Sequence, residues 1–164
     1  MREYVNGSDL LVSVAGKAVG HCTSHTATFN TETKDVAVKP AASTGPSSGS
    51  LYKSKRVTGL SVQVKADGLQ FYNEAESGFK ATLAPWSKGQ SVQLKLFERS
   101  QDSKPYVSGN FIISSIEQTA PAGEDATYSV TFDNDGAVEV DEENLDLIAE
   151  SSQNAGSPQN DGGQ

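Results

Sequence analysis

The stretch HCTSH at residues 21–25 holds the residues of this chain whose types and spacing suggest chemistry, namely both of its histidines and its only cysteine. On a helix, residues i and i+4 are neighbours, so His21 and His25 could bind one zinc ion together. A histidine beside Cys22 could instead serve as the base that activates a thiol nucleophile. Both possibilities depend on the backbone that carries the stretch.

The residues around HCTSH favour a strand over a helix. The segment AVGHCTSHTATFNTET is rich in Thr and has no apolar repeat of 3.6 residues. On a strand, His21, Thr23 and His25 would share one face, with Cys22 on the other. The two histidines would then lie about 13 Å apart, at about 3.3 Å per residue. Zinc is bound by imidazole nitrogens at about 2.0–2.1 Å, so we predict no metal site and no cofactor.

Other motifs of catalysis or ion binding are also missing from the sequence. Cys22 follows no nucleophile elbow or helix start that would lower its pKa. There is no G-x-S-x-G motif and no phosphate-binding glycine pattern. DNDG at 133–136 begins like a calcium loop, but Ala137 and Asn144 occupy positions where ligands are needed, so a turn is favoured. The sequence therefore predicts that the protein is not an enzyme.

Composition predicts one domain with a polar tail. The chain has 164 residues, a hydrophobic content of 35% and a net charge of −8. Six acidic residues and no Lys or Arg fall in 141–164, which leaves 15 of the 21 acidic residues to balance all 13 Lys and Arg. We expect a soluble domain at 1–140 and an acidic, flexible tail at 141–164, without a membrane anchor. The absence of a basic stripe argues against sequence-specific binding of nucleic acid.

Alternation with a period of two residues dominates the body of the chain. GLSVQVKA, SVQLKLF and ATYSVTF alternate apolar and polar residues, which is typical of strands with one buried face. DLLVSVAG and GNFIISSIE are more continuously apolar and predict strands covered on both sides. Gly, Asp and Asn clusters between these runs predict turns.

One segment, residues 71–86, has helical spacing instead. Its apolar residues recur every three or four positions, Gly78 weakens the helix or divides it into two, and Pro85 is expected to end it. We predict that this helix packs on a sheet through Phe71, Phe79, Leu83 and Trp86. The fold class is then mainly β, with two packed antiparallel sheets, as a sandwich or partly open barrel, and one flanking α-helix.

Residues 33–57 form the least globular part of the body. Their middle is rich in Pro, Ser, Gly and Ala, whereas the flanks carry five basic residues against one Asp. A loop of this length in a compact domain is usually functional or disordered, so a tolerated insertion remains the alternative. The basic flanks favour a loop that becomes ordered when it docks on another chain.

Three stretches, in this order and spacing, resemble major tail tube proteins of phages with long non-contractile tails. They are SDLLVSVAGKAVGHCTSHTATFNTETKD, VTGLSVQVKADGL and YVSGNFIISSIEQTAPAGEDATYSVTFDNDGAVE, and the tail after Asp141 lies outside them. The resemblance implies the tube fold shared with contractile tails and type VI secretion. It also implies hexameric rings that stack into a virion tail tube, assembled in the bacterial cytoplasm, through which double-stranded DNA passes without sequence recognition.

The same resemblance implies partners and contact residues. The partners would be further copies of the chain, a tape-measure protein and tail-terminator and tip proteins. The long loop at 33–57 would contact the adjacent ring, and its contact residues would be Lys34, Asp35, Lys39, Pro40, Tyr52, Lys53, Lys55 and Arg56. A tube of a contractile system is a close alternative. A monomeric β-sandwich that binds glycan or protein is the alternative from another class, and an enzyme comes third.

Overall fold

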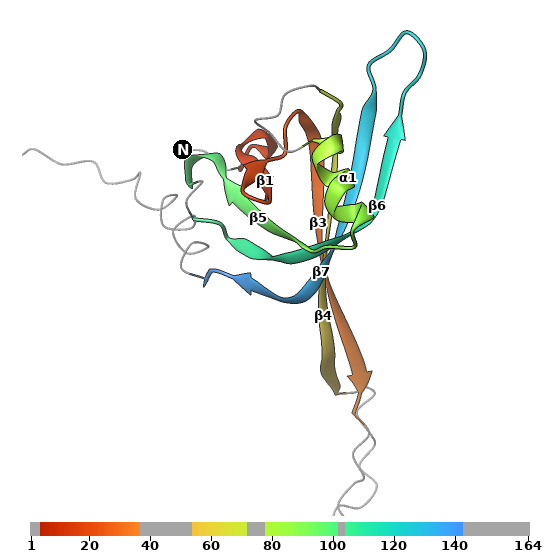
Figure 1. The fold of residues 1–164 in the computed structure, drawn as a ribbon. Coiled ribbons are helices and arrows are strands. Elements are labelled where there is room, and N and C mark those ends of the chain that lie inside the picture. The colour runs from red at the N-terminus through yellow and green to blue at the C-terminus, as the bar shows by residue number, and fades with distance from the viewer. Residues whose placement is uncertain (1–3, 37–53, 72–77, 102–103, 143–164) are drawn as a thin grey trace, which may run out of the picture.

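The computed structural model describes residues 4–36, 54–71, 78–101 and 104–142. Within these ranges the chain forms one antiparallel sheet of seven strands, in the order β2-β1-β5-β6-β7-β4-β3, and one α-helix (Figure 1). The strands are β1 (Leu10–Val14), β2 (Lys17–Ala18), β3 (Cys22–Asp35), β4 (Lys55–Leu69), β5 (Val92–Glu98), β6 (Val107–Thr119) and β7 (Thr127–Val140). The helices are α1 (Phe79–Ser87) and the short 3-10 helices η1 (Gly7–Asp9) and η2 (Arg99–Gln101).

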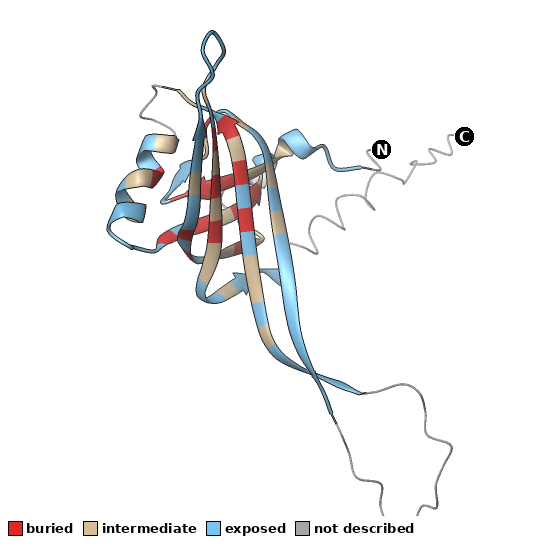
Figure 2. Cartoon of the chain, turned by 90° about the vertical axis from the view of Figure 1, so that its right-hand side faces the viewer, coloured by how far each residue is buried: buried red, intermediate tan, exposed pale blue. Residues whose placement is uncertain are grey.

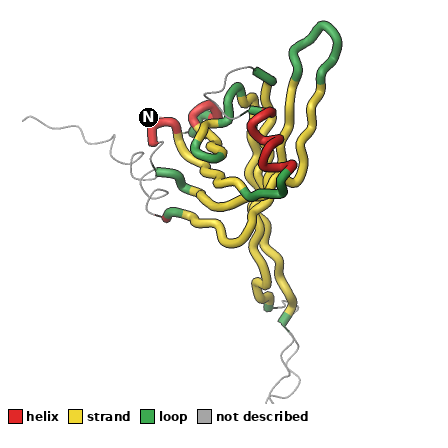
Figure 3. Tube along the Cα trace, in the orientation of Figure 1, coloured by secondary structure: helices red, strands yellow, loops and turns green. Residues whose placement is uncertain are grey.

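The long β6–β7 hairpin joins the two halves of the sheet. The beginning of β6 pairs with β5, and the beginning of β7 pairs with β4. The register between β6 and β7 shifts twice, between Gly109 and Phe111 and between Ile113 and Ser115. Such irregularities bend a strand and increase its twist, and both strands are visibly bent in Figure 3. The bend lets one sheet fold its two halves toward each other.

The core lies between these two halves of the curved sheet. Its largest fully buried side chains come from β4, β5, β6 and β7: Phe111, Phe132, Leu94, Leu96, Val64 and Val130. Figure 2 shows the buried residues concentrated in the upper body, with exposed strand below it. The fold is therefore mainly β, as predicted, but the two separate sheets are not found. A continuous β6–β7 hairpin replaces the expected break, which alternation alone could not show.

Helix α1 covers the second half of the predicted segment 71–86, and residues 72–77 lie outside the described residues. It begins after Gly78, and Pro85 lies inside its last part instead of ending it. Phe79 packs against the core, and Leu83 is half-buried. Trp86 is 52% exposed, so its predicted packing on the sheet is wrong, and the buried residue of the helix is Thr82. No helix in the described ranges is long and apolar enough to span a membrane.

Phe71 precedes α1 and is half-buried, outside the described part of any helix. Its ring lies 4.6 Å from the ring of His21, centroid to centroid. A Cβ atom built on Gly78 would come within 2.9 Å of the same ring. Phe71 therefore packs beside the start of the helix, as a neighbour rather than a member of the helical face.

The β3–β4 hairpin extends well beyond the body of the fold (Figures 1 and 2). Its pairing continues to Asp35 opposite Lys55, and the Val36 amide donates to the Ser54 carbonyl at 2.9 Å. The flanks of the predicted 33–57 loop are thus paired strands. This part of the loop prediction is wrong, because long alternating strands continue into the basic flanks.

Candidate functional site

The HCTSH stretch does not form the regular strand that its sequence predicts. His21 has a positive φ of 50° and precedes β3, which begins at Cys22. Within β3, the register with β4 shifts between Cys22 and Ser24, so Thr23 is an extra residue. An extra residue reverses the alternation of faces. Cys22 and His25 therefore lie on the same face of β3, although a regular strand would place them on opposite faces.

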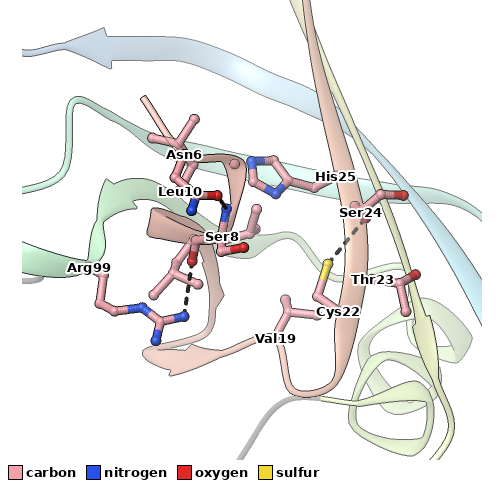
Figure 4. A pocket seen from close by; sticks show the side chains of 12 residues that line it. Asn6, Ser8, Leu10, Val19, Cys22, Thr23, Ser24, His25 and Arg99 are labelled. Atoms are coloured by element: carbon pink, nitrogen blue, oxygen red, sulfur yellow. Dashed lines mark hydrogen bonds between the residues drawn. The ribbon is translucent and has the colours of Figure 1, made fainter. Parts of the chain in front are cut away.

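Cys22 and His25 both line an open pocket of about 640 Å³ between β3 and the segment of η1 and β1. Figure 4 shows both side chains directed into this pocket, with Arg99 across it and Thr23 turned away. The Arg99 Nη2 donates to the Ser8 carbonyl at 3.0 Å, which ties η2 to the start of the chain. The pocket marks the opening between the two ends of the curved sheet.

The properties of the residues in this pocket are those of a structural surface and not of a reactive site. Burial raises the pKa of the Cys22 thiol, whose Sγ donates to the Ser24 carbonyl at 3.2 Å, so the reactive thiolate is disfavoured at neutral pH. Burial lowers the pKa of His25. In the described ranges, no three His, Cys, Asp or Glu side chains are grouped so that they could hold a metal ion.

A broad polar face lies on the opposite side of the same half-sheet. Cross-strand register places alternate residues of four neighbouring strands there, facing away from the core. We call this set the polar face; its members are Ser24, Thr26, Thr28, Asn30, Glu32, Ser61, Gln63, Lys65, Asp67, Ile112, Ser115, Glu117, Ser129, Thr131 and Asp133. Helix α1 packs on the other side, since Thr82 and Gly78 line a small cavity with buried residues of β4 and β7.

The polar face is tied together by side chains that bridge adjacent strands. Gln63 Nε2 donates to Asp133 Oδ1 at 3.0 Å between β4 and β7, and Ser24 Oγ donates to Asp67 Oδ2 at 3.5 Å between β3 and β4. Within β4, Lys65 Nζ lies 4.0 Å from Asp67 Oδ1. Ile112, 43% exposed, is its large apolar member. Sequence reasoning did not single out this face, although the polar positions of GLSVQVKA and the Thr-rich β3 contain the signal. What was missing was the register that aligns the strands.

The predicted contact residues of the 33–57 loop are divided by the structure. Lys34 and Asp35 end β3, and Lys55 and Arg56 begin β4, with Lys34 directly opposite Arg56. All four side chains are exposed. Lys39, Pro40, Tyr52 and Lys53 lie outside the described residues, as does the tail after 142.

Comparison with solved structures finds the same fold in assembled tails. The virion of a native gene transfer agent particle contains a chain that matches with a TM-score of 0.65 and 17% identity, over 84% of this chain and 99% of the other. A tail of an empty gene transfer agent particle, refined with C6 symmetry, gives 0.64 and 18% over the same shares. The SPP1 tail tube matches with 0.57 and 14%, over 98% of this chain and 94% of the other.

Comparison with curated protein sequences finds no match. The family model described as phage tail tube protein matches residues 5–140, which include every described helix and strand. The chain therefore belongs to the phage tail tube protein family, whose members are structural components of the virion tail and not enzymes.

Proposed function

We propose that this chain is the major tail tube subunit of its particle, assembling in the host cytoplasm into hexameric rings that stack into a conduit for double-stranded DNA. The family match and the fold shared with a C6-symmetric tail support this proposal. The tape-measure protein would occupy the lumen during assembly, and terminator and tip proteins would close the two ends.

The polar face is the observation that best supports the proposed role as a conduit for DNA. Its carboxylates (Glu32, Asp67, Glu117 and Asp133) outnumber its one cation, Lys65, and that cation already lies beside Asp67. A surface lined with hydroxyls, amides and excess negative charge repels the phosphate backbone, so DNA can slide past it without binding. We therefore assign the polar face to the lumen.

Ring closure also explains the exposed edge of the sheet. β3 has fourteen residues and, among the described strands, pairs only with β4, so its outer edge presents a row of unpaired backbone groups. Unprotected edges of this length promote aggregation unless a neighbour covers them. A cyclic, head-to-tail ring covers each edge with the next subunit.

Electron microscopy of the purified full chain tests the assembly. We expect hexameric rings or stacked tubes in negative stain at high protein concentration. Monomers under all conditions, even with a tape-measure partner present, would support the monomeric binding module instead.

The lumen assignment has a separate test. Replacing the exposed Thr28 and Ser115 by Arg should leave tubes intact but make them bind short fluorescent DNA duplexes, measured by co-sedimentation. Ala81→Arg on the exposed side of α1 is the matched control and should not bind DNA when short tubes are compared at equal mass. If the two polar-face substitutions bind no more DNA than this control, the face does not line the lumen.

A further inference from the structure

The motif DNDG at 133–136, for which the sequence predicts a turn, lies inside β7, where the projecting hairpin leaves the body. β7 pairs with β4 from Leu69 to Gln63. Beyond Gln63, β4 continues to Lys55 and pairs, among the described strands, only with β3. We call this projecting part, residues 29–35 and 55–62, the stem (Figures 1 and 2). Its direction depends on how β4 is held at this branch point.

A side chain of DNDG extends the strand pairing by one step into the stem. Because Gln63 pairs with Asp133, a continued register would pair Val62 with Asn134. The pairing stops there, but Asn134 Oδ1 accepts a hydrogen bond from the Val62 amide at 2.9 Å. The oxygen of the side-chain amide thus takes the place of a backbone carbonyl in the next step of the ladder.

The same side chain also holds the bend of β7. Asn134 Nδ2 donates to the Gly136 carbonyl at 2.9 Å. Three residues of β7, 135–137, stand opposite the single residue Asn110 of β6. Gly136 has a φ of 85°, a conformation that favours glycine, and extra residues of this kind bend a strand. One side-chain amide therefore joins the bend of β7 to the first residue of the stem on β4.

The surroundings of Asn134 favour this arrangement. Asn134 is half-buried and pairs with Phe111, which is fully buried, while Val62 packs against the core. A backbone amide at such a position costs free energy if it has no acceptor, so Val62 favours the conformation in which Asn134 reaches it. On the polar face, the hydrogen bond from Gln63 to Asp133 links the same two strands. The branch point is thus held from both faces of the sheet.

We propose that Asn134 is a positioning residue that fixes the direction in which the stem leaves the body, by joining Val62 to the bend of β7. The consequence for assembly rests on the proposed function. Identical subunits of a ring carry their stems at the same angle, and a stem that has this angle before assembly loses less conformational freedom when a subunit is added.

Hydrogen exchange of the Val62 amide tests the hydrogen bond directly. Asn134→Leu keeps a side chain of similar size and removes both hydrogen bonds, so this exchange should become about tenfold faster. Asn134→Asp keeps an acceptor for Val62 and should retain most of the protection. Asn110→Leu, at an exposed asparagine opposite the bulge, is the matched control and should exchange like the unmodified chain. Equal exchange in all forms, measured by NMR, would show that Asn134 does not hold Val62.

Distances between two spin labels test the direction of the stem. In a Cys22→Ser background of the full chain, the labels are attached at Glu32→Cys on the stem and Ala81→Cys on α1, both of which are exposed positions. Double electron–electron resonance of dilute protein should give one narrow distance distribution. Asn134→Leu should lose this narrow distribution, whereas Asn134→Asp should keep it.

A narrow distribution in the leucine form would overturn the proposal. The Asn110→Leu control should also give a narrow distribution, and a broad one would show that any substitution near the bulge has this effect. If circular dichroism shows that the leucine form is not folded, Asn134→Ala removes the same hydrogen bonds without adding apolar bulk.

The critical concentration for tube formation, measured by sedimentation, tests the consequence for assembly. Asn134→Leu should raise it about tenfold, because the stem is no longer fixed beforehand, and Asn110→Leu should leave it unchanged. A broad distance distribution with an unchanged critical concentration would exclude a role of Asn134 in assembly. If the unmodified chain forms no tubes, the proposed tube function is wrong, whereas the spin-label distances still decide whether Asn134 fixes the stem.

Discussion

The two halves of strand β4 have the same alternation of apolar and polar residues, but their apolar positions differ in what covers them. Val64, in the body, is fully buried, whereas Leu60, four residues earlier on the same face, is 73% exposed. Val64 lies under the opposite half of the sheet, which ends before Leu60. The body half of the strand stabilises the monomer, and the projecting half is available to another copy.

This difference separates stability from assembly along a single strand. A substitution in the body removes contacts that the isolated chain already makes, so it lowers the free energy of unfolding. A substitution in the projecting half removes contacts that exist only after assembly, so the isolated chain should scarcely respond. The predictions below test how sharply the two halves differ.

The largest effect is expected in the core. Phe111→Ala should lower the free energy of unfolding by about 3–5 kcal/mol, because Phe111 is fully buried where the two halves of the sheet meet and its loss leaves a cavity. Leu60→Ala should change it by no more than about 0.5 kcal/mol. Urea unfolding of dilute protein, where assembly does not add to stability, measures both. Comparable losses would mean that the projecting stem is part of the monomer core.

Two glycines of β4 give the next largest contrast. A Cβ atom on Gly68 would lie 2.8 Å from the His21 carbonyl oxygen and 3.0 Å from the Tyr128 ring, which is itself buried and donates to the Gly20 carbonyl. Gly68→Ala should therefore lower the free energy of unfolding by about 1–3 kcal/mol through overpacking.

Gly59, in the projecting half, is the matched control for this crowding. Its Cβ atom would meet only the Glu32 side chain, with the carboxylate oxygen at 3.0 Å, and that flexible end can move away. Gly59→Ala should be neutral or slightly stabilising, because glycine weakens a strand interior. A loss at Gly59 as large as that at Gly68 would show that the stem is as tightly constrained as the body.

The faces of β4 could be predicted from sequence, but their environment could not. GLSVQVKA correctly puts Leu60, Val62, Val64 and Ala66 on one face, as the register with β3 and β7 shows. Alternation depends only on the two-residue period of a strand. Whether a position is covered depends on where the remaining strands end, and this requires the non-local pairing of β5 and β6.

The HCTSH stretch shows the second limit of pattern reading. Its strand character was correctly predicted from Cys22 onward, yet one extra residue at Thr23 moved Cys22 onto the face of His25. A bulge has no strong sequence signal here, since Thr and Ser are equally suited to regular strands. Face assignments along a strand are therefore safe only up to its first bulge.

The helix prediction failed for a different reason. Of the positions that the spacing of three and four residues placed on a helical face, Phe71 lies outside α1, and Trp86 lies at the exposed end of this helix, which is only nine residues long. Thr82 takes the buried position because its hydroxyl donates to the Phe79 carbonyl at 2.7 Å and is thereby satisfied inside the helix. A hydropathy pattern ranks Trp above Thr and cannot anticipate this internal hydrogen bond.

The smallest effect is expected from pH, at the end of β3 that belongs to the body. Because burial lowers the pKa of His25, the unfolded chain, in which this residue titrates near 6.5, takes up a proton before the folded chain does. Stability should therefore fall as pH decreases from about 6.5 toward the lower folded pKa, and His25 should have no such effect above about 6.5.

His25→Asn removes this titration and should flatten the dependence of the urea midpoint on pH between about 7 and 5.5, above the range in which most carboxylates titrate. His21→Asn replaces the other histidine, which precedes β3 and is exposed. This variant should lose as much stability as the unmodified chain when the pH falls. If His25→Asn loses stability as steeply as the unmodified chain, another group is responsible for it. In that case His25, in the pocket at the opening of the sheet, is as accessible to solvent as the residues of the projecting stem.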